Sequence, residues 1–248
     1  MTTWYQLTAT VVVISLVTYA IVKVIDRFRR DHAHEVDDDR TGVKIGAAFA
    51  VYGVLLGFSV VAAQQTYTDA EYSLRSEMGA TMAVLHIAKA LPPQEGQPIL
   101  DSLGNYLRAE IKNWSALSEE EGDSESLHDL RDVFTHVQAL SGDRSTSAAQ
   151  QQLFASLADV DAGRANRLMV VQDTTSALIW VLLLGGAVLV IAMASLLNFE
   201  SPRLRYLLLI SMAVLIGVSL FTFWALSTPF SGPVPIDSEP LSRVLSHL

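Results

Sequence analysis

The sequence predicts an all-α integral membrane protein with four transmembrane helices and a helical bundle outside the membrane. Four stretches contain no Asp, Glu, Lys, Arg or His: residues 4–22, 45–63, 176–197 and 206–226. Each has about the 20 apolar residues that a helix needs to cross a hydrocarbon layer of about 30 Å. Between the second and third stretches, apolar residues recur every three or four positions, which indicates amphipathic helices rather than strands.

The predicted organisation has four parts in chain order. They are a first transmembrane pair at 1–64, with spans at about 4–25 and 44–64, an extramembrane bundle at 65–175, a second transmembrane pair at 176–227, and a tail at 228–248. The tail holds four of the eight prolines, so it is expected to be extended and either packed on a surface or loosely ordered.

Two long helices are expected to form the bundle together with the amphipathic helices. No proline follows span two before Pro92, and only Gly163 interrupts residues 150–175 ahead of span three. Spans two and three are therefore predicted to continue beyond the membrane as an antiparallel pair, which helices at about 99–117 and 127–140 would close into a bundle.

Basic residues predict the orientation of the spans. The loop 23–44 carries six Lys and Arg, and the short connection before span four carries Arg203 and Arg205. Because short cytoplasmic loops are enriched in Lys and Arg, both connections are predicted to be cytoplasmic. Alternation of the spans then places both termini and the bundle on the extracytoplasmic side.

Span two carries a stripe of small residues, Gly46, Ala50, Gly53 and Gly57, spaced so that they share one helix face. Small residues at this spacing allow two helix backbones to approach closely. Packing inside one subunit is the commoner reason for such a stripe. The alternatives are packing against a neighbouring subunit or a narrow conduit within a ring of identical subunits.

If span two lines a conduit, its remaining apolar residues would form the constriction, and the residues just outside it would form the mouth. Phe58 and Val60 are the candidates for a hydrophobic constriction that gates by dewetting. The candidates for the mouth are Gln64, Asp69, Glu71 and Glu77. For any one of these polar residues, an ordinary water-facing surface is the commoner interpretation. Residues 65–175 hold 17 Asp and Glu against 8 Lys and Arg, and such an acidic vestibule would attract cations.

The sequence offers little support for enzymatic or metal chemistry. It contains no cysteine, no phosphate-cradling glycine loop and no hydrolase or zinc-protease motif. Asp37, Asp38 and Asp39 are weak candidates for a divalent metal site, but six bases balance the six acids from Lys23 to Lys44, and a solvated linker is the better interpretation. We therefore expect no enzyme activity, no cofactor and no nucleic-acid partner.

Several short stretches together resemble one known family. They are Tyr52-Gly53-Val54-Leu55-Leu56-Gly57-Phe58, residues 67–71, Glu77, Leu91-Pro92, the helix with Tyr106 and Trp114, Arg164 and Arg167, and Pro229-Phe230-Ser231-Gly232. In this combination the chain is similar to the bacterial bestrophin-like family of unknown function over nearly its whole length. The resemblance implies a four-span helical protein of the bacterial cell membrane, a homo-oligomer, and a distant link to anion conduction.

The favoured function is a homo-oligomeric ion channel or channel-like pore, with span two lining or nearest the axis and with its ion selectivity left open. Its partners would be the lipid bilayer, copies of itself and ions. The alternative is a non-conducting scaffold or envelope sensor whose helical bundle binds a partner or a ligand.

Overall fold

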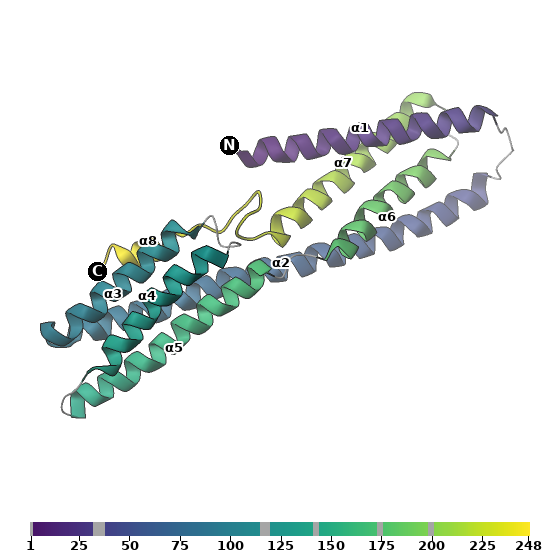
Figure 1. Cartoon of the computed structure of the whole chain (residues 1–248). Helices are drawn as coiled ribbons and strands as arrows, with labels where there is room; N and C mark the ends of the chain where they lie inside the picture. The colour runs from purple at the N-terminus through teal and green to yellow at the C-terminus, as the bar shows by residue number, and fades with distance from the viewer. Residues whose placement is uncertain (1, 32–37, 115–119, 141–143, 173–175, 198–200) are drawn as a thin grey trace. The chain divides into compact units, whose positions relative to one another are not determined.

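The computed structural model describes residues 2–31, 38–114, 120–140, 144–172, 176–197 and 201–248 (Figure 1). Its elements in these ranges are helices: α1 (Thr2–Asp31), α2 (Asp38–Ala90), α3 (Pro93–Lys112), α4 (Glu120–Gln138), α5 (Arg144–Gln172), α6 (Ala177–Ser195), α7 (Pro202–Ser227) and α8 (Glu239–Leu245). Helices α1, α2, α6 and α7 are long and apolar enough to cross a membrane. The predicted all-α fold with four apolar spans is therefore confirmed.

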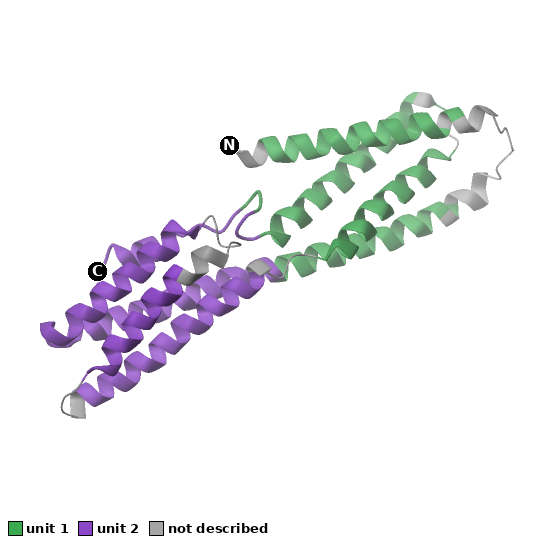
Figure 2. Cartoon of the chain, viewed as in Figure 1, with its two compact units in different colours: residues 1–65, 175–228, 232–234 green, residues 66–174, 229–231, 235–248 purple. Residues whose placement is uncertain are grey.

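The chain divides into two compact units (Figure 2). The spanning unit comprises residues 1–65, 175–228 and 232–234, and the bundle unit comprises residues 66–174, 229–231 and 235–248. Helix α2 contributes to both, because its 53 residues contain no proline and run without a break. A 30 Å hydrocarbon layer needs only about 20 helical residues, so α2 is far longer than a single crossing requires.

The chain ahead of span three differs from the expectation of one continuous helix. Helix α5 ends at Gln172, and α6 begins at Ala177 as a separate helix. The side chain of Ser176 accepts a hydrogen bond from the backbone N–H of Leu178 at 3.3 Å, which caps α6. Serine at this position stabilises a new helix start and competes with continuation of the preceding helix. Residues 173–175 lie outside the described ranges.

The core of the spanning unit is apolar and joins α2, α6 and α7. Leu56, Leu183 and Ile216 are among its buried residues. The hydroxyl of Tyr52 donates a hydrogen bond to the backbone carbonyl of Leu183 at 3.0 Å. A Cβ atom at Gly186 would lie 2.7 Å from the Tyr52 ring, so this glycine allows α6 to pack directly on the aromatic face.

The bundle unit has its own core, formed by the second part of α2 with α3, α4, α5 and α8. Helix α3 packs on α4 and on α8, and α4 packs on α5. Its fully buried side chains include Leu74, Leu103, Leu130 and Leu157. Two of the predicted helices, at about 99–117 and 127–140, correspond to α3 and α4.

Most of the C-terminal segment, residues 229–231 and 235–248, belongs to the bundle unit. In its short helix α8, Leu241 and Val244 are fully buried. Upstream of α8, the backbone carbonyl of Ile236 accepts a hydrogen bond from the Trp114 indole N–H at 3.0 Å. These contacts fasten the segment to α3.

Candidate functional site

The glycines of span two do not pack inside the subunit. A Cβ atom built at Gly46, Gly53 or Gly57 would meet no atom within 4 Å, and Ala50 is exposed. The commoner interpretation of such a stripe, packing against another helix of the same subunit, is therefore not what the structure shows. The bare backbone of this face is open to whatever surrounds the subunit.

Large apolar side chains cover the adjacent, outward face of the same helix. Val51, Val54, Phe58 and Val61 recur at intervals of three, four and three, and their exposed fractions lie between 55% and 70%. At 3.6 residues per turn this spacing keeps them on one face. Val60 is different: it is half-buried and packs against the core of the spanning unit. The two candidates for a constriction, Phe58 and Val60, thus lie on different faces of α2.

An apolar groove of about 410 Å³ lies between α2, α6 and α7 in the spanning unit. Gly53 and Gly57 line its α2 side, Val190 its α6 side, and Leu215 and Ser219 its α7 side. The missing side chains of the glycines therefore leave space that no residue of the described chain fills.

Of the predicted mouth residues, Gln64 lies at the end of the α2 part of the spanning unit, and Asp69, Glu71 and Glu77 lie in the bundle unit. Gln64 and Asp69 are exposed, and the partly exposed Glu71 pairs with Arg75 one turn later on α2. Glu77 contradicts the prediction, because its side chain is fully buried and forms an ion pair with Arg167 of α5. Glu77 therefore belongs to the core of the bundle unit and does not face a water-filled mouth.

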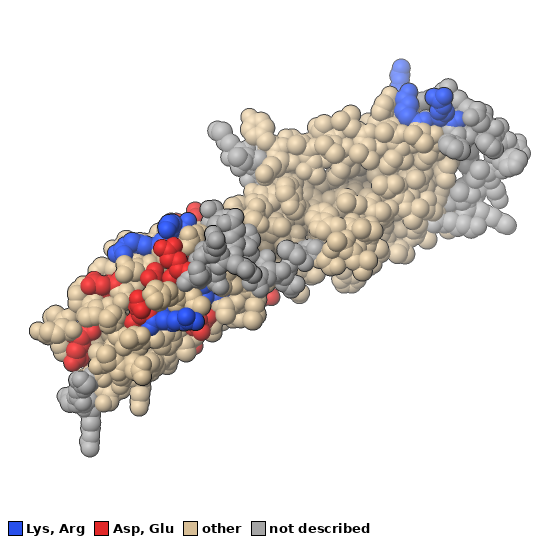
Figure 3. All heavy atoms as spheres, in the orientation of Figure 1, with Lys and Arg blue, Asp and Glu red and all other residues tan. Residues whose placement is uncertain are grey.

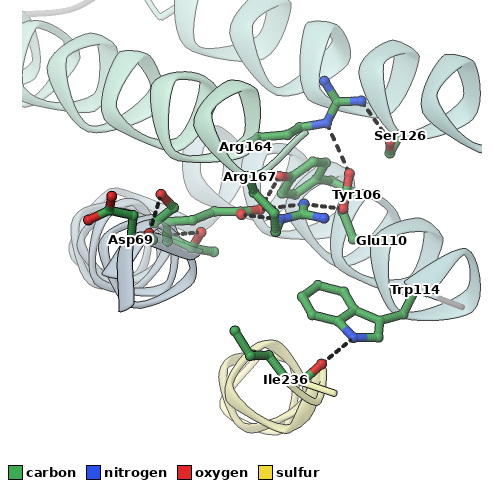
Figure 4. Close-up of polar contacts among 11 residues, drawn as sticks. Asp69, Tyr106, Glu110, Trp114, Ser126, Arg164, Arg167 and Ile236 are labelled. Carbon is green, nitrogen blue, oxygen red and sulfur yellow. Dashed lines mark hydrogen bonds and ion pairs between the residues drawn. The ribbon is translucent and has the colours of Figure 1, made fainter. Parts of the chain in front are cut away.

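Glu77 is the first member of a buried ionic cluster that links four helices. Figure 4 labels its other members, Tyr106, Glu110, Ser126, Arg164 and Arg167. Arg167 Nε donates to Glu77 Oε2 at 3.0 Å, and the Tyr106 hydroxyl donates to Glu77 Oε1 at 2.7 Å. A Cβ atom at Gly163 would lie only 2.9 Å from the Cβ of Glu77, so α5 approaches α2 closely here. Glycine at this position lets Arg167, one turn later, reach the carboxylate.

Glu110 of α3 is the second carboxylate of the cluster. It accepts from Arg164 Nε at 3.0 Å and also from Arg167 Nη2. Arg164 further donates to the hydroxyl of Ser126 in α4 at 3.2 Å. The guanidinium of Arg167 lies over the ring of Trp114, 4.9 Å from its centroid. Two carboxylates and two guanidiniums thus balance in charge, as buried charges require.

The two carboxylates are shifted in opposite directions: burial raises the pKa of Glu77 above its ordinary value, although Arg167 and Tyr106 favour its charged form. Burial pushes the pKa of Glu110 upward, but Arg167, Ser126 and Arg164 outweigh burial and leave the pKa below its ordinary value. Burial and the nearby charges of Glu77 and Glu110 raise the pKa of Tyr106 well above its ordinary value. Tyr106 therefore remains a hydrogen-bond donor, and the cluster acts as an ion-paired link between α2, α3, α4 and α5.

The sequence did contain a signal for this cluster. On α5 the buried positions Leu153, Leu157 and Val160 continue at the same spacing to Arg164 and Arg167. On α2, Leu74, Glu77 and Thr81 follow the same rule. A charged residue at a position of the buried stripe predicts a paired interior charge, because an unpaired one is too costly to bury.

The weak metal candidates are not brought into a site that the structure describes. Asp37 and the side chains of Asp38 and Asp39 lie outside the described residues. Among the residues that were searched, no group of three His, Asp or Glu is placed to hold a metal ion.

Comparison with known proteins identifies the family and the fold. The sequence model of the Bestrophin-like domain family matches residues 10–241 of the chain. Crystal structures of two single-substitution variants of a bacterial bestrophin homolog from Klebsiella pneumoniae are similar to the chain, with TM-scores of 0.71 and 0.74 at 10% sequence identity. Each comparison covers 98% of this chain and 97% of the other. A further crystal structure, described as a membrane protein, gives a TM-score of 0.74 at 10% identity and covers 97% of this chain and 96% of the other.

No curated protein matches the chain significantly. The match to the family model spans nearly all of both compact units, from α1 into α8. The chain therefore belongs to the Bestrophin-like domain family.

Proposed function

We propose that the protein is a homo-oligomeric ion channel or channel-like pore in which the outward face of α2 lines the axis or lies nearest to it. The observation that carries the proposal is the exposure of this face. Phe58 is 70% exposed, and a Cβ atom at Gly46, Gly53 or Gly57 would meet no atom within 4 Å. A helix that presents both bare backbone and large apolar side chains outward is suited to contact copies of itself in a ring.

Phe58 would form the narrowest ring of such a pore. Apolar side chains that converge on an axis exclude water and act as a hydrophobic gate. Gln64 and Asp69 are exposed farther along α2 and would lie at the mouth. Glu71 contributes less negative charge there, because Arg75 pairs with it. Ion selectivity stays open in this proposal.

Phe58→Ala is expected to increase the current through reconstituted protein several-fold, because a smaller side chain relieves dewetting at the constriction. The measurement is single-channel recording in planar bilayers, with oligomeric state checked by size-exclusion chromatography with light scattering. Leu178→Ala is the matched control, since Leu178 on α6 is 76% exposed but lies off α2. An intact wild-type oligomer that conducts at no pH or voltage would contradict the proposal.

The alternative function is a non-conducting sensor that binds a ligand through the bundle unit. A groove of about 580 Å³ between α2 and the C-terminal segment favours it. Tyr67 and Ile236 contribute apolar surface to this groove. Its charged lining residues are Asp237 and two ion pairs, Arg75 with Glu71 and Arg243 with Glu239. Binding of a small ligand that shifts the melting temperature of wild-type protein but not of Tyr67→Ala, without any conductance, would favour this function over a pore.

For orientation in the membrane, the distribution of Lys and Arg supports a cytoplasmic position for the two short connections and an extracytoplasmic position for the bundle unit. Because the chain has no cysteine, single cysteines can report on each side. We expect Tyr72→Cys to react with a membrane-impermeant maleimide in intact cells, and Arg203→Cys to react only after permeabilisation. The reverse pattern would invert the orientation.

A further inference from the structure

A second apolar groove in the spanning unit, separate from the α2 groove, has basic residues next to one end. It has a volume of about 250 Å³ and runs along α1 and α7. Ser15 and Tyr19 line it from α1, and Tyr206 and Ile210 line it from α7. Its volume is slightly below that of pockets that hold whole small molecules, and it suits a segment of a single hydrocarbon chain.

The interior of this groove offers little to a polar ligand. The hydroxyl of Ser15 donates to the backbone carbonyl of Val11 at 2.8 Å, so its proton is already used within α1. Thr18 likewise donates to Ile14 at 2.8 Å. A groove with apolar walls and internally bonded hydroxyls favours hydrocarbon over water.

Basic side chains lie just beyond one end of the groove on both helices. Lys23 follows the groove residue Tyr19 by one turn of α1, and its Nζ lies 5.5 Å from the centroid of the Tyr19 ring. Arg203 precedes the groove residue Tyr206 by one turn of α7. Both basic residues are exposed. Arg205, in the same turn as Arg203, donates to the carbonyl of Ser195 at 2.7 Å and so fixes the start of α7 to the end of α6.

The visible face of the spanning unit likewise has its basic side chains at one end. In Figure 3 the rest of its described surface carries neither basic nor acidic colour. The sequence places Asp26 and Glu200 in the same stretches, with side chains outside the described residues. Aromatic residues next to basic ones at the end of an apolar span are typical of the level of lipid headgroups.

We propose that the groove between α1 and α7 binds one acyl chain of an anionic phospholipid, with the headgroup phosphate held by Lys23 and Arg203. The occupant is a lipid rather than a helix of a second copy because charge complementarity extends to the end of the groove, where a phosphate would lie. This inference needs only a membrane-spanning unit, and it is independent of whether α2 lines a pore.

The test combines one charge variant and one groove variant, each with a matched control. Full-length protein is exchanged into micelles with equal amounts of phosphatidylglycerol and phosphatidylcholine, and bound lipid is counted by native mass spectrometry. Lys23→Gln with Arg203→Gln removes the headgroup contacts, and Arg131→Gln with Lys112→Gln is its control in the bundle unit, because both residues are exposed there. Ser15→Phe fills the groove, and Val13→Phe places the same ring on α1 at a 57% exposed residue outside the groove.

Wild type and both controls are expected to retain phosphatidylglycerol in preference to phosphatidylcholine. The double glutamine variant should bind it about tenfold or more weakly, as expected from about 1 kcal/mol per basic residue near a membrane surface. Ser15→Phe should lose it as well, and Ser15→Leu replaces that variant if the larger ring prevents folding.

Three outcomes would overturn the inference. If the charge variant loses lipid while Ser15→Phe behaves like Val13→Phe, basic residues attract headgroups without a groove site. If neither variant loses lipid, no anionic lipid is held here. If Ser15→Phe instead changes the oligomeric state and leaves lipid binding intact, the groove belongs to a contact between copies of the chain.

Discussion

Arg167→Met is expected to lower the free energy of unfolding by about 3–5 kcal/mol, the cost typical of removing one partner from a buried ion pair. Methionine preserves much of the side-chain volume but leaves Glu77 and Glu110 buried with only Arg164 to balance them. The measurement is thermal and denaturant unfolding in detergent, followed by tryptophan fluorescence. Trp114 is a suitable reporter, since its ring contacts the Arg167 guanidinium.

Two further variants separate the loss of charge balance from loss of packing. Arg131→Met on α4 removes an exposed arginine and is expected to change stability by less than about 0.5 kcal/mol. Glu77→Gln combined with Arg167→Met restores equal numbers of positive and negative groups, so the double variant should recover part of the stability lost by Arg167→Met alone. Additive destabilisation in the double variant would show that Glu77 and Arg167 are not energetically coupled.

Gly163→Ala is expected to destabilise the bundle unit by about 1–3 kcal/mol, although alanine normally stabilises a helix relative to glycine by about 1 kcal/mol. Steric overlap decides the sign. The new methyl group would lie 3.0 Å from the Cα and 3.1 Å from the backbone N of Glu77, and atoms of an α-helical backbone cannot move aside as a flexible side-chain end can. Helices α5 and α2 would have to separate, which would also lengthen the ion pair of Arg167.

Gly79→Ala is the matched control for this substitution. Gly79 also lies inside a helix, but a Cβ atom there would meet no atom within 4 Å. It should therefore leave stability unchanged or raise it by up to about 1 kcal/mol. Equal effects of the two alanines in the same unfolding assay would show that α5 and α2 are not in the close contact described above.

The elements that the sequence predicted correctly are those whose signal is local. The four spans follow directly from runs of apolar residues, and α3 and α4 follow from periodic positions such as Leu103 and Leu107. The separation of α5 from α6 was harder to predict. It depends on Ser176, a residue that fits either inside a helix or at its start, and only the structure shows that it caps α6.

The candidate site was predicted less completely. Tertiary contacts decide which side chains face the core and which residues form ion pairs. The sequence offered Phe58 and Val60 together for the constriction, and only the structure shows that Val60 packs against the core while Phe58 is exposed. Glu77 was assigned to water because it is charged, whereas its partner Arg167 is 90 residues away in sequence. Only the packing of α5 on α2 brings the two together.

The buried ionic cluster also bears on how uniquely the bundle unit is folded. If only leucines packed between the helices, a shift of one helix by one turn would cost little free energy, because the next leucine along the helix could occupy the same site. Glu77 and Glu110 have no other carboxylate one turn away on the same helix face, so a shift of α2 or α3 by one turn would leave buried arginines without their partners. We infer that the cluster selects a single longitudinal register for α2, α3 and α5. Hydrogen exchange should then be more uniform in wild type than in a variant with Glu77, Glu110 and Arg167 made apolar.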